Sequence, residues 1–183
     1  MGSPLTNRAP LTELADRWQH IETKGIVQQL PRLAAALAKD FAKLPAEVQA
    51  PSWRQYPVTI TLRFGWADER REYVSLEGEA AARIGAICQR CLEPFDLELR
   101  TALKLLLIRP GDAVAERPGY EAWELEEPNL RPIDIVDEAL VMAMPLAPRH
   151  ETECRAVPRA MQRDEGATTR PFADLRSRLR DTE

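Results

Sequence analysis

The chain has 183 residues, of which 44% are hydrophobic and 30% are charged, and its formal net charge is −4. This length suffices for one compact domain with a tail, but not for two domains with separate cores. The composition excludes global disorder and a fibrous repeat, and the net charge argues against a protein that coats nucleic acid by bulk electrostatics. The sequence lacks both an apolar stretch of membrane-spanning length and a signal peptide's apolar run, so we expect a cytoplasmic protein.

The first quarter of the chain predicts one clear helix. Apolar residues recur at helical spacing between residues 30 and 44, and Pro45 ends the run. The preceding polar stretch around Trp18 predicts a short helix or a loop that ends near Gly25.

The period of the apolar pattern then changes from helical spacing to alternation. Apolar and polar residues alternate along residues 58–64, and the same rhythm continues through residues 73–76, 80–87 and 95–107. Alternation of this kind is typical of strands that have one buried and one solvent-exposed face. The sequence therefore predicts an antiparallel meander.

The following segment contains a long loop and a second helix. Residues 112–132 are acidic and rich in proline, which predicts an extended loop with a short strand around residues 123–125. Residues 134–144 carry an apolar stripe, and Asp134 is predicted to cap that helix. We therefore expect an α+β fold over residues 1–154, in which two helices cover an antiparallel sheet.

Charge is distributed unevenly towards the end of the chain. Residues 112–138 carry nine acidic side chains and two arginines, whereas residues 155–183 carry seven arginines and five acids. The second segment predicts a basic flexible tail, in which Phe172, Leu175 and Leu179 share one face of a short amphipathic segment. The arginines of such a tail either contact phosphate or are simply solvated.

The three cysteines and one histidine carry the clearest chemical signal. Cys88 and Cys91 form a C-x-x-C between two predicted strands, and His150 and Cys154 form an H-x3-C after the second predicted helix. Together these four residues are a candidate Cys3His zinc site. Two alternatives stay open, which are a redox-active thiol pair and a stiff turn that binds no metal.

Catalytic motifs are missing from the sequence. It contains no glycine-rich phosphate loop, no G-x-S-x-G and no H-E-x-x-H, and the adjacent acids Glu126 and Glu127 fall in the predicted loop, where solvated side chains are common. We therefore expect that the protein is not an enzyme.

Several segments together resemble the YceD family, the large ribosomal RNA subunit accumulation proteins. The most specific segments are the C-x-R-C turn, the acidic start of the second helix, the proline turn that follows it, and a Pro-Phe-Ala-x-Leu segment near the end, at residues 87–95, 133–140, 144–148 and 171–175. The chain also resembles the opening of that family at residues 10–12 and 24–26, and carries Tyr120-Glu121 within its acidic stretch.

The resemblance implies a non-enzymatic bacterial or plastid factor needed for the accumulation of large-subunit (23S) ribosomal RNA. Its partners would be pre-ribosomal RNA or a large-subunit ribosomal protein, without a membrane or a small-molecule substrate. We expect Arg90 to contact phosphate and Phe172, Leu175 and Leu179 to form a docking face.

The segment after the proline turn and the acidic stretch bear on this interpretation. Some relatives carry a second cysteine cluster after the proline turn, where this chain offers only His150 and Cys154, so zinc binding depends on those two residues. The rival hypothesis is an adaptor that holds a basic ribosomal protein through the acidic residues 112–138 and makes no contact with RNA.

Overall fold

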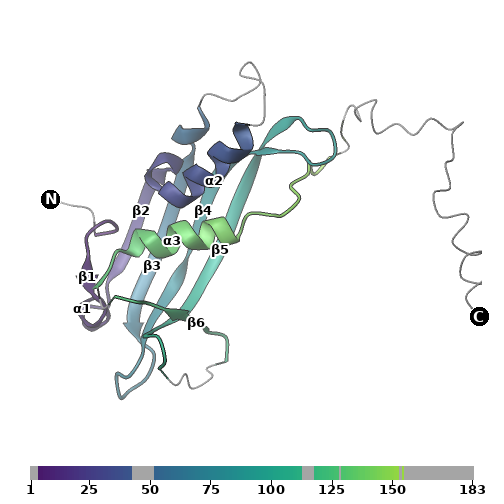
Figure 1. Cartoon of the computed structure of the whole chain (residues 1–183). Coiled ribbons are helices and arrows are strands. Elements are labelled where there is room, and N and C mark those ends of the chain that lie inside the picture. Colours follow the sequence, from purple (N-terminus) through teal and green to yellow (C-terminus); the bar gives the residue numbers. More distant parts are fainter. Residues whose placement is uncertain (1–3, 43–51, 113–117, 128, 153, 155–183) are drawn as a thin grey trace, which may run out of the picture.

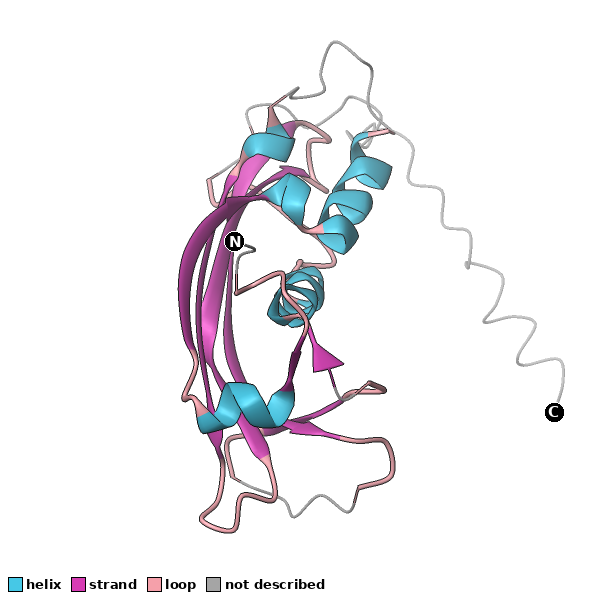
Figure 2. Cartoon of the chain, turned by 90° about the vertical axis from the view of Figure 1, so that its left-hand side faces the viewer, coloured by secondary structure: helices cyan, strands magenta, loops and turns pink. Residues whose placement is uncertain are grey.

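The computed structural model of the chain describes residues 4–42, 52–112, 118–127, 129–152 and 154. Five strands form one curved sheet, and helices pack against a single face of it (Figure 1, Figure 2). This arrangement confirms the predicted α+β fold with a mostly antiparallel sheet.

The strand order of the main sheet follows the chain, as expected for a meander. The strands, in that order, are β2 (His20–Ile26), β3 (Pro57–Trp66), β4 (Val74–Ile87), β5 (Pro94–Ile108) and β6 (Glu121–Glu124). The neighbouring pairs from β2 to β5 are antiparallel, whereas β6 lies parallel to β5. A second, two-stranded ribbon pairs β1 (Ala9–Pro10) with β7 (Asn129–Leu130).

Two helices of equal length supply most of the helical cover of the core. They are α2 (Pro31–Phe41) and α3 (Pro132–Met142), and they correspond to the two predicted helices. The shorter helical elements are α1 (Leu11–Asp16), η1 (Val27–Gln29) and η2 (Trp53–Gln55). The apolar stripe of α2 is fully buried, as is that of α3, and both pack on the inward side chains of the strands. No helix of the described part of the chain is long and apolar enough to cross a membrane.

The structure corrects three details of the predicted elements. The segment expected to be a short helix or loop before Gly25 contains the edge strand β2, after the short helix α1. The two strands predicted at residues 73–76 and 80–87 are one continuous strand, β4. The loop predicted over residues 112–132 does contain a short strand, but this strand, β6, pairs in parallel with β5.

Gly78 lies between the two strands that the sequence predicts, but in the structure it is part of β4. A Cβ atom at this position would lie 2.0 Å from the carbonyl oxygen of Thr61 on β3. Glycine is therefore required by the close approach of two paired strands, and does not mark a turn.

A buried carboxylate joins the two main helices. Asp137 of α3 is 2% exposed, and its two carboxylate oxygens accept hydrogen bonds from the backbone N–H groups of Arg32 (2.8 Å) and Leu33 (2.9 Å). These groups belong to the first turn of α2, whose own N-cap residue offers no side-chain hydrogen bond. Asp137 therefore caps α2 from another helix.

The predicted cap of α3 is wrong. The helix begins at Pro132, two residues earlier than predicted, and its N-cap residue is Arg131. Asp134 lies inside the first turn and binds the Arg131 guanidinium through both carboxylate oxygens, at 2.8 and 2.9 Å. A proline at the first helical position costs no hydrogen bond, which explains the earlier start.

Candidate metal centre

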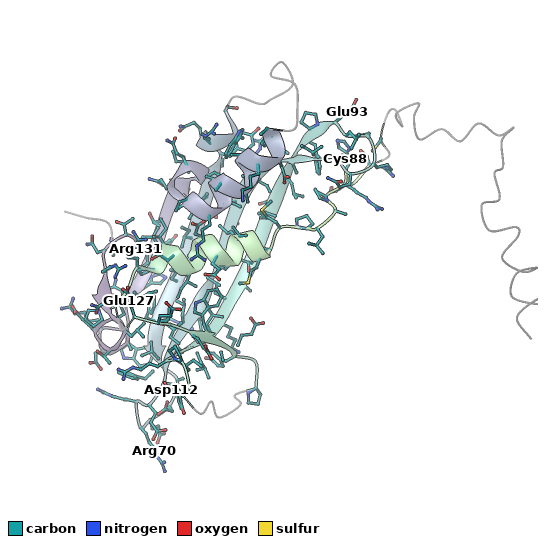
Figure 3. All side chains as sticks on the ribbon, in the orientation of Figure 1. Arg70, Cys88, Glu93, Asp112, Glu127 and Arg131 are labelled. Carbon is teal, nitrogen blue, oxygen red and sulfur yellow. The ribbon has the colours of Figure 1, made fainter. Side chains whose placement is uncertain are left out.

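The C-x-x-C motif occupies the turn between β4 and β5, as the sequence predicts. We call residues 88–93 the turn; Figure 3 shows Cys88 and Glu93 at this end of the sheet, far from Arg70 and Asp112 at the other end. The turn is closed by two backbone hydrogen bonds, from the N–H of Cys88 to the carbonyl of Glu93 (3.0 Å) and from that of Leu92 to the carbonyl of Cys88 (2.8 Å). These bonds bring both thiols of the motif to one side of the turn.

The segment that follows α3 returns to this turn. We call residues 145–154 the strap, of which the structure describes all but residue 153. The carbonyl of Pro148 accepts a hydrogen bond from the Gln89 N–H (2.8 Å), and the His150 ring packs on the Phe95 ring with centroids 4.6 Å apart. Further along, two strap residues contact Arg90. Every second residue of the strap, from 148 to 154, thus contacts the turn or the start of β5.

The turn and the strap bring together the four predicted metal ligands. The ligand atoms of Cys88, Cys91, His150 and Cys154 all lie within 4.8 Å of one another. The Sγ atoms of Cys88 and Cys154 are 3.6 Å apart, and the Nδ1 atom of His150 lies 3.6 Å from the Sγ of Cys91 and 3.5 Å from that of Cys154. We call these four residues the cluster.

Three of the six spacings among these atoms are close to the edges of a tetrahedral zinc site. Zn–S bonds of about 2.3 Å and Zn–N bonds of about 2.05 Å imply S···S edges of about 3.8 Å and S···N edges of about 3.6 Å. The same distances exclude a disulfide, because bonded sulfurs lie about 2.05 Å apart, and all three cysteines are free. The cluster could therefore hold a metal ion.

Electrostatics within the cluster favour a cation. Burial alone would raise the pKa of the Cys88 thiol, but hydrogen bonds from backbone groups of Cys91, His150 and Arg90 outweigh it and lower that pKa to about 5. Burial, followed by the neighbouring thiols, raises the pKa of Cys91 to about 11. Backbone hydrogen bonds therefore stabilise a thiolate at Cys88, which is the form in which a cysteine binds a metal ion.

Of the other predicted site residues, the structure describes only Arg90. Arg90 lies in the turn, with its guanidinium directed at the strap. Phe172, Leu175 and Leu179, together with the whole basic tail over residues 155–183, lie outside the described residues. Their roles therefore stay predictions.

Sequence reasoning assigned Arg90 to phosphate contact and did not predict its contact with the strap, and it gave Phe95 no role at this end of the molecule. Arg90 hydrogen-bonds to Cys154 across 64 residues of sequence, and the Phe95 ring packs on the His150 ring at a tilt of 43°. The C-x-R-C spacing was a signal that Arg90 belongs to the turn, but nothing in a single sequence pairs it with Cys154.

Comparison with known proteins places the whole centre within one family. No solved structure matches this chain. The family model described as the large ribosomal RNA subunit accumulation protein YceD matches residues 76–177. The match contains most of β4, the turn, β5, α3, the strap and all four residues of the cluster, whereas the opening motifs at residues 10–12 and 24–26 lie outside it. Because the matched segment covers more than half of the sequence, the chain belongs to the YceD family of large ribosomal RNA subunit accumulation proteins.

Proposed function

We propose that this protein is a cytoplasmic, non-enzymatic factor that promotes the synthesis, processing or stability of large-subunit (23S) ribosomal RNA. The observation that carries the proposal is the family match, which spans the turn, α3 and the strap. The cluster supports a non-enzymatic role, because four protein ligands fill a tetrahedral ion's coordination shell and leave no position for a substrate or a reactive water.

We further propose that the cluster binds zinc. Three thiolates and an imidazole are ligands that zinc accepts readily, and the spacing of the ligand atoms fits a tetrahedron. When bound, the ion would supply a cross-link between the turn and the strap, which are separated by more than fifty residues of sequence. Its role would be to hold the β4–β5 end and the chain that leads into the tail in one fixed arrangement.

The proposed partner is pre-ribosomal large-subunit RNA, contacted by Arg90 and by the tail residues Phe172, Leu175 and Leu179. Contacts of arginines with phosphate release counterions, so the affinity for RNA should fall steeply as salt is raised. If the affinity for RNA does not depend on salt, contact between these arginines and RNA phosphate is refuted, and a protein partner is favoured.

The alternative is an adaptor that binds a basic ribosomal protein without RNA. The exposed side chains of Glu124, Glu126 and Glu127 favour it, since they lie at or just after β6, away from the cluster (Figure 3 shows Glu127 near the opposite end from Cys88). Replacing all three with glutamine separates the hypotheses. Loss of ribosomal-protein capture with intact RNA binding supports the adaptor, and the reverse result refutes it.

Depletion of the protein in its own host tests the proposed function. We expect the ratio of large- to small-subunit ribosomal RNA to fall, and we expect a copy of the wild-type gene to restore it. A copy carrying Cys88→Ser and Cys91→Ser should restore it less well if the cluster matters. An unchanged ratio after depletion would refute the role in large-subunit RNA accumulation.

A further inference from the structure

We propose that Arg90 is a positioning residue of the metal centre, which holds Cys154 in place and supplies a positive charge beside the negatively charged filled cluster. This inference rests on the zinc site proposed above and adds a fifth residue to it. The residue sits between the two ligands of the C-x-x-C motif, so the turn that carries Cys88 and Cys91 also carries Arg90.

The contacts of Arg90 span the gap between the turn and the strap. Its Nε–H donates to the Sγ of Cys154 over 3.0 Å, and its Nη2 donates to the carbonyl oxygen of Thr152 over 2.9 Å. Two donors of one rigid, planar group thus bind two acceptors that lie two residues apart on the strap. This geometry fixes both the position and the direction of the strap at the point where it delivers its last ligand.

Cys154 is the ligand that most needs such support. Cys88 and Cys91 are 0% and 6% exposed and are held by the closed turn, whereas Cys154 is only partly buried and lies at the end of a segment with no regular secondary structure. A ligand on an irregular strap has more freedom to leave the metal than one on a hydrogen-bonded turn. The hydrogen bond from Arg90 restricts that freedom.

The charge of the cluster provides the second argument. A Zn²⁺ ion bound to three thiolates and a neutral imidazole carries a net charge of −1, and two of its thiolates are buried. A buried net charge is unfavourable unless a counter-charge is close. The Arg90 guanidinium supplies a counter-charge beside Cys154, at a site to which the Glu93 carboxylate, 3.9 Å from the Sγ of Cys91, adds a further negative charge. Its N–H···S bond withdraws electron density from the thiolate that is most accessible to solvent.

This role and the predicted contact with RNA phosphate lead to different results for the same substitution. If Arg90 positions Cys154, Arg90→Gln weakens zinc binding in the absence of RNA. If Arg90 only contacts phosphate, the same substitution weakens RNA binding and leaves the affinity for zinc unchanged. The two measurements can be made on one preparation of the full chain.

The test is competition for zinc between the full-length protein and a chromogenic chelator. Arg90→Gln should weaken zinc binding by about 10- to 100-fold, which is the usual consequence of losing a group that orients a metal ligand. Arg90→Lys keeps the charge but loses the two-donor fork, and should give an intermediate loss. The matched control is Arg149→Gln, which removes an equal charge from an exposed arginine beside His150 and should change the affinity little.

A second readout addresses Cys154 itself. On the zinc-loaded protein, Arg90→Gln should increase the rate of alkylation at Cys154, measured by mass spectrometry, more than at Cys88 or Cys91. Equal zinc affinities for Arg90→Gln and Arg149→Gln, with unchanged alkylation, would overturn the inference. A wild-type protein that binds no zinc would instead refute the zinc proposal on which the inference depends, and the ratio of ribosomal RNAs after depletion tests the biogenesis role independently of both.

Discussion

Two regions of the described structure join α3 and the strap to the rest of the fold, and they do so by different means. Near the middle, Asp137 joins α3 to the first turn of α2 through two hydrogen bonds from backbone N–H groups. At the β4–β5 end, the strap meets the turn through three thiols, an imidazole and a guanidinium.

The two regions differ in whether their own polar groups satisfy one another. The carboxylate of Asp137 and the amides that it binds satisfy one another, so this contact is self-sufficient even though it is buried. In the cluster, four metal-ligand atoms lie within 4.8 Å of one another, and burial together with the neighbouring thiols raises the pKa of Cys91. The first region, which we call the joint at Asp137, is a complete structural contact, whereas the second could hold a metal ion.

Metal removal should give the largest loss of stability. It tests whether the cluster, unlike the contact at Asp137, depends on a bound ion. We expect purified protein to contain one zinc per chain, and a strong chelator to lower its melting temperature. A ligand at a free concentration 1,000-fold above its Kd stabilises a fold by about 4 kcal/mol, which sets the scale of the loss. Elemental analysis and thermal unfolding with and without chelator are the measurements.

The matched variants for this experiment are Cys88→Ser and Cys154→Ser. Both should lose the bound ion, and neither should respond to the chelator. Because Cys88 is fully buried, its replacement carries a packing cost of its own, whereas the half-buried Cys154 provides the cleaner comparison. If the metal-free protein has the same melting temperature as the zinc-loaded protein, the cluster needs no metal ion for stability and the prediction is wrong.

The joint at Asp137 should give the next largest effect. Asp137→Ala removes both acceptors and leaves two N–H groups at the start of α2 without their partner, so we expect a loss of about 2–3 kcal/mol in the free energy of unfolding. Asp137→Asn, which keeps one acceptor, should lose less. Urea denaturation measures both, and zinc stoichiometry should remain that of the wild type.

The control for this prediction is the neighbouring residue Glu138. It pairs with the Arg32 side chain across the same two helices (2.6 Å), but both groups are exposed to solvent. Glu138→Gln should therefore cost less than about 1 kcal/mol. Equal losses for the two positions would show that burial and backbone capping do not set the strength of this joint.

The main elements were predictable because their patterns are periodic and their apolar residues are buried. The helix α2 shows an uninterrupted stripe, and β3 and β5 alternate over most of their length. The edge strand β2 was missed because His20, Glu22 and Lys24 are exposed and Ile21 is its one fully buried residue, so no alternation of apolar residues is visible. The parallel pairing of β6 was missed because the direction of a strand after a long loop is not encoded in its own residues.

The metal ligands were predictable for a different reason. Cys88, Cys91, His150 and Cys154 form two short motifs whose spacing suits one ion, and His20 was the only other candidate of their type. Arg90 and Asp137 could not be assigned in the same way, because their partners lie 64 and about a hundred residues away and neither residue type is rare. Asp137 looks, in the sequence, like any other acid in the first turns of a helix.

An exposed contact on the uncovered face of the sheet gives the smallest predicted effect and tests whether burial explains the strength of the joint at Asp137. The carboxylate of Glu77 accepts hydrogen bonds from the Tyr120 hydroxyl and from the Arg63 guanidinium. These bonds, the first from Tyr120, hold the pKa of Glu77 below its usual value of 4.5. The folded state therefore binds this carboxylate's proton less tightly than the unfolded state does.

It follows that Glu77 stabilises the fold above about pH 4.5, and that this contribution disappears as the pH falls through the lowered pKa of the folded state. Because the side chain is 31% exposed, Glu77→Gln should cost only about 0.5 kcal/mol at pH 7. The difference from the wild type, measured by urea denaturation, should shrink as the pH is lowered below 4.5. The control is Glu79→Gln on the same strand, which removes an equal charge from an exposed side chain. A loss at Glu77 as large as that at Asp137 would mean that the charge of the acceptor, and not its burial, determines how strongly these carboxylates hold the fold together.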